Sequence, residues 1–157
     1  MSENIDENDV NILNILQSDA TRSLESIADE VGISLNTCWR RVQRLENVGI
    51  LQGRVAMVDN EKVGLPLTVF VSVRTRDHSK VWAETFTQAV NSIPEIVEFY
   101  RLAGDVDYIM KMIVRSVADY DRVYQSLIAQ VSLSDVSASF AMEKLKFTTE
   151  LPLRKTK

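Results

Sequence analysis

The sequence has few of the residues and segments that several common protein classes require. Its 157 residues include one cysteine and one histidine, Cys38 and His78, so it can form no internal disulfide and has a poor set of metal ligands. No apolar run approaches the ~18 residues of a membrane span. A glycine-rich phosphate loop, a Gly-x-Ser-x-Gly motif and a signal-peptide pattern are also missing. We therefore expect a cytoplasmic, non-enzymatic protein without a metal or cofactor.

The composition indicates an ordinary globular protein, with 45% hydrophobic and 25% charged residues, enough for one large domain or two small ones. Its net charge of -4 argues at first against a nucleic-acid partner. However, residues 34–54 contain four arginines against Glu46 alone, a local balance of +3. Binding to DNA depends on the phosphates that are neutralised locally, so the acidic chain total does not exclude it.

Three short helices are predicted before residue 52. Asp6 and Ser23 are candidate N-caps of the first two, and Gly32 ends the second. Ser34 is the candidate N-cap of the third helix, which Gly49 closes. Its apolar positions recur at helical spacing and predict a buried stripe: Leu35, Cys38, Val42 and Leu45. A short helix, a glycine-bearing turn and a second helix with a polar outer face are typical of the helix-turn-helix arrangement.

The polar face of the third helix is the candidate DNA-binding surface. Together with one arginine of the following extended segment, 53–58, it supplies six candidate contacts: Ser34, Asn36, Thr37, Arg40, Arg44 and Arg54. Arginine can pair with guanine and asparagine with adenine, while a helix N-terminus with hydroxyl side chains favours a phosphate oxygen. Arg41 is a seventh candidate with two open interpretations, contact with phosphate or an ion pair with an acidic neighbour. Trp39, on the opposite flank, is expected to pack, and Cys38 to be a small buried hydrophobe.

A second domain is predicted after a linker at 56–66 that contains Gly64 and Pro66. Alternating or β-rich segments predict strands at 67–74, 96–102, 108–114 and 136–142, the last extending towards Leu145. Helical periodicity follows Ser79 and Ser116. The order βαββαβ predicts a ferredoxin-like α+β domain, with two helices on one face of an antiparallel sheet. The other face also carries apolar residues and is expected to pack against another subunit: Phe70, Tyr100, Leu102, Ile109 and Ile113.

These motifs together resemble the Lrp/AsnC family of bacterial and archaeal transcription regulators. The segments that carry the resemblance are WRRVQRLENVGIL at the end of the third helix, GDVDY at the central hairpin and KFTTELPL near the C-terminus. The resemblance implies a winged helix-turn-helix domain over residues 1–55 and an effector-binding and oligomerisation domain over 67–157. It also implies homodimers, tetramers or octamers on a pseudo-palindromic DNA operator, modulated by an amino acid or a related metabolite.

The same resemblance places the effector at five positions in the second domain: Gly104, Asp105, Asp107, Ser137 and Ser139. Backbone N–H groups and carboxylates there could hold the two charged ends of an amino acid. A glycine-aspartate pair in a tight hairpin is equally ordinary turn chemistry, so both interpretations stay open for the hairpin residues.

Two other functions compete with a ligand-responsive regulator. Some haem-pathway decarboxylases resemble the same two-domain layout and hold a tetrapyrrole rather than DNA. The basic outer face of the third helix argues against that enzyme, and His78, beside Asp77 in a polar stretch, is expected to be a solvated loop residue. A family member that organises DNA architecture without a ligand is the second alternative.

Overall fold

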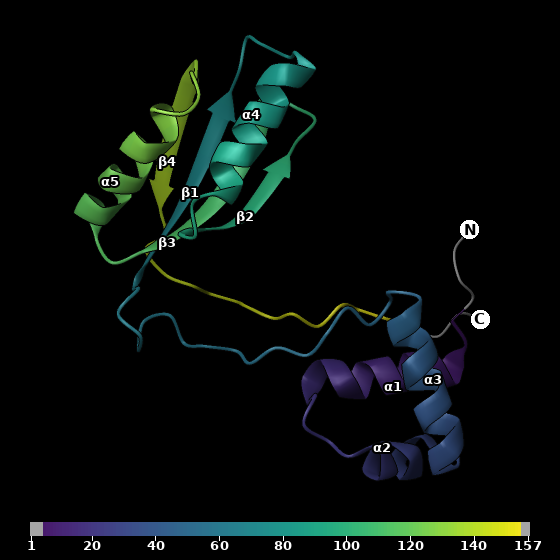
Figure 1. Ribbon diagram of the computed structural model, residues 1–157. Coiled ribbons are helices and arrows are strands. Elements are labelled where there is room, and N and C mark those ends of the chain that lie inside the picture. The colour runs from purple at the N-terminus through teal and green to yellow at the C-terminus, as the bar shows by residue number, and fades with distance from the viewer. Residues whose placement is uncertain (1–4, 155–157) are drawn as a thin grey trace. The chain divides into compact units, whose positions relative to one another are not determined.

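The structure, a computed structural model, describes residues 5–154. Residues 1–4 and 155–157, at the outer ends of the two predicted domains, lie outside this range. The chain divides into two compact units, which we describe separately: residues up to Ala56 together with those from Lys146, and Met57–Leu145 (Figure 1). Among the described residues, no helix has both the length and the apolar character that crossing a bilayer requires.

The first unit contains three helices, α1 (Glu7–Ser18), α2 (Leu24–Val31) and α3 (Leu35–Asn47). All three predicted N-caps are confirmed, since the side chains of Asp6, Ser23 and Ser34 each accept a backbone N–H from the first turn of their helix. Gly32 ends α2 with φ of 75°, a left-handed conformation that favours glycine. The tight turn between α2 and α3 is therefore built from local sequence signals.

A small apolar core joins these helices. Its buried residues are Ile12, Leu16, Ile27, Ala28, Cys38 and Val42. Cys38 is fully buried, as expected, and burial raises the pKa of its thiol. The predicted stripe is wrong at Leu35, which is 51% exposed. Leu35 is the first residue of α3 and lies at the edge of the core. It lines a groove there together with Leu24, the first residue of α2.

The C-terminal segment belongs with the first unit, unlike the predicted domain limit of 67–157. The side-chain amide of Gln17 on α1 pairs with the backbone of Leu151 in both directions: its Oε1 accepts the Leu151 N–H at 2.7 Å, and its Nε2 donates to the Leu151 carbonyl at 3.3 Å. These hydrogen bonds tie a segment 134 residues away to α1. Periodicity cannot detect such a contact, because it joins residues far apart in the sequence.

The second unit has the predicted βαββαβ order. Its elements are β1 (Leu67–Arg74), α4 (Lys80–Asn91), β2 (Ile96–Arg101), β3 (Tyr108–Val114), α5 (Val117–Ile128) and β4 (Asp135–Phe140). The strands form one antiparallel sheet in the order β2-β3-β1-β4, the ferredoxin-like arrangement. Strand β4 ends at Phe140, before the predicted residue 142, and residues 53–58 belong to no helix or strand.

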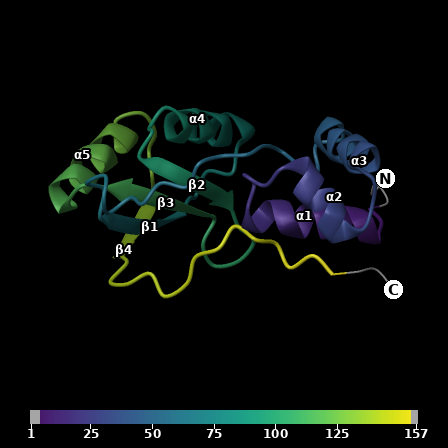
Figure 2. The same ribbon diagram turned by 90° about the horizontal axis from the view of Figure 1, so that it is seen from below.

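Helices α4 and α5 cover one face of this sheet (Figure 2). Beneath them, Phe86 is fully buried among the rings of Trp82, Phe99 and Tyr108, with ring centroids 5.0–5.2 Å from its own. On the opposite face, Phe70 and Tyr100 are 40% and 54% exposed. The apolar character of this outer face, predicted from the sequence, is therefore present on the surface of the single chain.

Candidate DNA-binding and ligand-binding sites

The N-terminal half of α3 presents a polar surface. The hydroxyl of Ser34 accepts the backbone N–H of Thr37, and the two hydroxyl groups lie 2.8 Å apart. Asn36 and Arg40 are exposed on the same part of the helix, whereas Thr37 is half-buried. The helix N-terminus, two hydroxyls, an amide and a guanidinium are thus gathered within two turns, a set of donors suited to phosphate oxygens and base edges.

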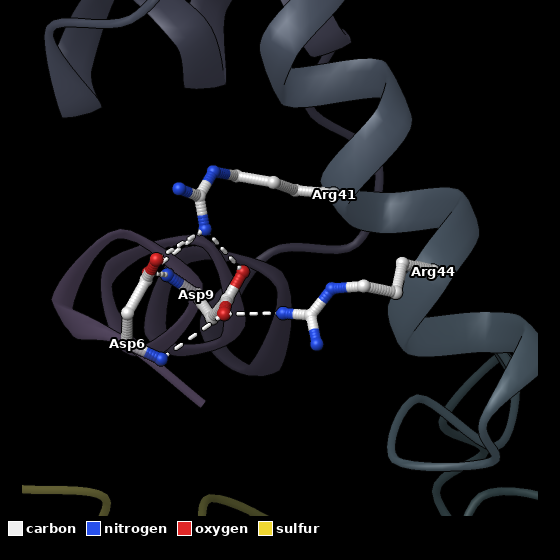
Figure 3. Close-up of polar contacts among 4 residues, drawn as sticks. All are labelled: Asp6, Asp9, Arg41 and Arg44. Carbon is white, nitrogen blue, oxygen red and sulfur yellow. Dashed lines mark hydrogen bonds and ion pairs between the residues drawn. The ribbon is translucent and has the colours of Figure 1, made fainter. Parts of the chain in front are cut away.

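A buried carboxylate holds the flank of α3 against α1 (Figure 3). Asp9 is fully buried and accepts hydrogen bonds from two arginines of α3: Arg41 donates to Oδ1 at 2.9 Å, and Arg44 donates to Oδ2. Arg41 also donates to both carboxylate oxygens of Asp6, at 2.8 and 2.7 Å. Two aspartates three residues apart, the N-cap Asp6 and Asp9 of α1, therefore face two arginines three residues apart on α3.

These ion pairs shift the pKa values of Asp6 and Arg41. A hydrogen bond from the backbone N–H of Asp9, followed by one from the Arg41 side chain, lowers the pKa of Asp6. The hydrogen bond to Asp6 in turn raises the pKa of Arg41. Both groups are stabilised in their charged forms, so the ion pair is intact at neutral pH.

The network changes the interpretation of the candidate DNA contacts. Of the two interpretations of Arg41, the structure supports the ion pair. Arg44, expected to point into solvent, is directed to Asp9, a contact that the helical periodicity of α3 alone could not reveal. Arg54 lies 3.2 Å from Glu46. Arg40 is the one arginine of this cluster that forms no ion pair within residues 5–154.

The local charge is consequently smaller than the sequence suggested. With Asp6 and Asp9 counted beside Glu46, four arginines face three carboxylates, and the balance is +1 rather than +3. Trp39, expected to pack, has half of its surface covered and is 50% exposed beside Leu35 and Asn36. The periodicity placed Trp39 at the edge of the apolar stripe, and at such an edge a large ring can lie outside the core.

Three of the predicted ligand positions, Gly104, Asp105 and Asp107, lie at one end of the sheet in the second unit. In the loop between β2 and β3, Gly104 has φ of 152° and Asp105 is exposed. Asp107 accepts the backbone N–H of Thr75 at 2.8 Å through Oδ2, and its own N–H donates to the carbonyl of Val73. The turn interpretation therefore accounts for Asp107, which links the end of β1 to the start of β3.

The two serines lie on β4, on the sheet face that the helices leave uncovered. Ser137 pairs with Ser72 and Ser139 with Phe70 in the register of β1. Strand β1 separates β4 from β3, so the hairpin loop and Ser137 are about 10 Å apart across two strand spacings. Side chains, together with hydrogen bonds of about 3 Å at each end of a small amino acid, can cover such a separation.

No group of three or more histidine, cysteine, aspartate or glutamate residues suited to a metal ion occurs within residues 5–154. His78 is exposed in the loop before α4, in the position expected of a solvated residue.

Comparison with known proteins supports the assignment of both domains. Residues 5–52 match the family model described as winged helix-turn-helix DNA-binding, and residues 68–151 match the model of the Lrp/AsnC ligand binding domain. The chain belongs to the Lrp/AsnC family. The fold class expected from the sequence, a winged helix-turn-helix domain followed by a ferredoxin-like domain, is thereby confirmed.

Several characterised relatives of this Lrp/AsnC protein are transcription regulators. The chain is 47% identical over 156 residues to the glutamate uptake regulatory protein of Zymomonas mobilis, covering 99% of this chain and 95% of the relative. It is 45% identical over 150 residues to the DNA-binding transcriptional activator DecR of Escherichia coli, covering 95% and 99%. This family member is accordingly a DNA-binding transcriptional regulator with a ligand-binding domain.

Solved structures show the same fold. An AsnC family transcriptional regulator from Agrobacterium tumefaciens is 47% identical, with a TM-score of 0.91 over 94% of this chain and 97% of that one. A transcriptional regulator from Neisseria meningitidis in complex with L-Met is 29% identical, with a TM-score of 0.88 over 95% and 97%. The similarity thus extends over both domains.

The Asp6 ion pair predicts how stability depends on pH. Because the pKa of Asp6 is lowered in the folded Lrp/AsnC protein, its contribution to the free energy of unfolding is complete above the unfolded value of about 4 and is lost as the pH falls through the folded value. Asp6→Asn retains a side chain that can cap α1 but removes the charge. The free energies of unfolding of wild type and Asp6→Asn, measured by urea denaturation, should differ most above about pH 4 and converge at lower pH.

Arg41→Ala serves as the comparison variant. It removes one of the two main causes of the Asp6 shift but leaves the hydrogen bond from the Asp9 backbone, so the Asp6→Asn effect measured in its background should be reduced and not abolished. Parallel curves for wild type and Asp6→Asn across the whole pH range would contradict the prediction.

Proposed function

We propose that this protein binds a pseudo-palindromic operator as a homodimer or a higher oligomer, through the N-terminal half of α3. The observation that carries the proposal is the polar cluster of Ser34, Asn36 and Arg40, all exposed, with the half-buried Thr37, on a helix whose opposite side is buried and whose flank is held by Asp9. In helix-turn-helix proteins the second helix enters the major groove with its N-terminal residues on the base edges. Arg54, in the following segment, is proposed as a phosphate contact.

The roles of Arg41 and Arg44 in this proposal are altered by their ion pairs. Each is proposed to hold α3 in its orientation through Asp9, with any DNA contact made by the guanidinium nitrogens that the aspartates leave free. Arg40 is the arginine whose whole side chain is available. It is therefore the residue on which the DNA proposal is most directly tested.

We expect Arg40→Ala to weaken DNA binding. Selection of genomic fragments with the purified protein would first yield an operator, and dissociation constants on that duplex would follow over a range of salt concentrations. The variant should bind at least about tenfold more weakly, and if Arg40 contacts phosphate, the slope of log K against log[salt] should become shallower by about one per contact. Unchanged affinity and slope would remove Arg40 from the interface.

The exposed Arg115, between β3 and α5 in the other unit, provides the matched control. Arg115→Ala removes the same charge from the chain, so it tests whether a loss of affinity reflects position or total charge. Its dissociation constant should stay within about twofold of that of the wild type. Retention of no genomic fragment at all would overturn the DNA proposal as a whole.

The oligomer is proposed to form through the outer face of the sheet. Phe70 lies near the centre of that face, opposite Lys111 on β3 and Ser139 on β4. Tyr100 and Ile109 pair next to it on the same face. An exposed apolar surface of this kind marks an interface, and two-fold pairing of identical surfaces is the commonest way for a homo-oligomer to bury it.

Phe70→Lys should shift the protein towards the monomer. Lys111, opposite position 70, is already paired with Glu98 at 2.7 Å, so the new ammonium group would add an unpaired charge to the apolar face, and burying it would be unfavourable. Sedimentation velocity should show a smaller species at concentrations where the wild type is a dimer or larger. Val81→Lys, at a 74% exposed position on α4, is the control and should sediment as the wild type does. Identical profiles for wild type and Phe70→Lys would place the interface elsewhere.

An amino acid is proposed as the effector, supported by the match to a ligand-binding domain and by the L-Met complex of the Neisseria relative. Gly104, Asp105, Ser137 and Ser139 are the proposed contacts, at a subunit interface, and Asp107 is proposed to shape the loop between β2 and β3. Such a ligand would change DNA binding by favouring one assembly or one dimer geometry, since only a difference in affinity shifts an equilibrium.

Titration calorimetry against the twenty amino acids tests this site. At least one should give saturable heat, and Asp105→Ala should weaken its binding at least about tenfold, because a carboxylate that holds an ammonium group would be lost. Asp121→Ala, an exposed position on α5, should leave the heat unchanged. Absence of saturable heat from every amino acid would favour the ligand-independent architectural role.

The relatives' descriptions favour a regulator over the decarboxylase alternative, and we propose that the protein has no enzymatic activity. A regulator must reach DNA, so a cytoplasmic location follows from the proposed function.

A further inference from the structure

The second flank of α3 carries an uncovered apolar surface. Trp39 and Leu35 are 50% and 51% exposed, and together with Leu24 and Asn36 they line a shallow groove of about 540 Å³ between the starts of α2 and α3. This flank is opposite the one where Arg41 is held by Asp6 and Asp9. The helix is therefore fixed by ion pairs on one side and presents a large aromatic ring on the other.

Exposed hydrophobic residues are common, so exposure alone assigns no role to Trp39. Its location is more informative. Asn36 lines this groove and also belongs to the polar surface, and Thr37 and Arg40 line the adjoining hollow beside Asp6 and Asp9. The apolar groove is thus continuous with the proposed DNA-binding surface, in the half of α3 that a helix-turn-helix protein inserts into the major groove.

The chemistry of the major groove contains one matching apolar group. Each base pair presents hydrogen-bond donors and acceptors there, and thymine alone among the unmodified bases adds a C5-methyl group. An indole ring and a leucine side chain can remove such a methyl group from water without requiring a polar partner. Insertion of the ring between base pairs fits less well, because side chains that wedge between bases typically act from the minor groove.

We propose that Trp39, assisted by Leu35, contacts thymine methyl groups in the operator and thereby determines specificity for A·T pairs at the contacted positions. The proposal rests on the DNA binding proposed above. It adds a specificity-determining residue that contributes no charge and no base-directed hydrogen bond.

Single thymine-to-deoxyuridine replacements in the selected operator provide the test, because each removes one methyl group and preserves base pairing. At one or two positions per half-site, the wild type should lose about fourfold in affinity, the amount expected for one buried methyl-sized group. Trp39→Ala should bind the parent duplex more weakly and lose its sensitivity at those positions. The ring is half exposed, so this variant should remain folded, which thermal unfolding followed by circular dichroism checks.

Arg40→Ala is the matched control, since it weakens binding from the neighbouring position yet should retain the wild-type sensitivity to deoxyuridine. Equal sensitivity in wild type and Trp39→Ala, or none in either, would overturn the thymine contact while leaving DNA binding intact. A Trp39→Ala variant with normal DNA affinity but an altered sedimentation profile would assign the groove to contact between protein subunits instead. Failure of the wild type to bind any duplex would refute the proposed function, and this inference with it.

Discussion

The buried carboxylate of Asp9 is the interaction on which the DNA-binding unit depends. A charge with no exposed surface is costly unless it is paired, and Asp9 is compensated by Arg41 and Arg44 together with the backbone N–H of Asp6. Because these donors come from α3 and from the N-cap of α1, the network acts with the buried side chains of Cys38 and Val42 to fix the rotation of α3 about its own axis. With that rotation Asn36 and Arg40 are exposed, and Thr37 and Arg40 line a hollow that Asp6 and Asp9 also border, so the network lies directly beside the proposed DNA-binding surface.

Much of the fold could be predicted because its determinants are local. Asp6, Ser23 and Ser34 act on backbone N–H groups within their own first turns, and the alternation of Val69, Val71 and Val73 places those side chains on the buried face of β1. These signals need no knowledge of distant residues. The order of the elements then leaves few topologies for a small antiparallel sheet with two helices on one face, and the ferredoxin-like arrangement is among them.

The features that could not be predicted depend on residues far apart in the sequence or on the edges of apolar stripes. The spacing of Arg44 on its helix says nothing about Asp9, 35 residues earlier. Trp39 and Leu35 lie at the boundary between the buried and exposed faces of α3. At such a boundary a small rotation of the helix decides whether a side chain is packed or exposed. The ligand site is harder still, since Ser137 and the loop at Gly104 are separated by β1, and the apolar pattern that predicts a subunit-facing sheet surface does not specify how the serines and the loop are arranged around a ligand.

The reduced charge of the helix-turn-helix unit constrains how it can hold an operator. With three carboxylates beside four arginines, the electrostatic attraction of one copy to DNA is weak, which fits the proposed binding as an oligomer and favours contacts other than phosphate pairing. Hydrogen bonds from Asn36 and the apolar surface at Trp39 would supply such contacts. Neither releases counterions, and an apolar contact is not screened by salt, so binding based on them would depend less on ionic strength than binding by an unpaired arginine cluster. Because Arg41 and Arg44 are paired with aspartates that hold α3 in place, the proposed surface is better suited to distinguish between DNA sequences than to bind any DNA by charge alone.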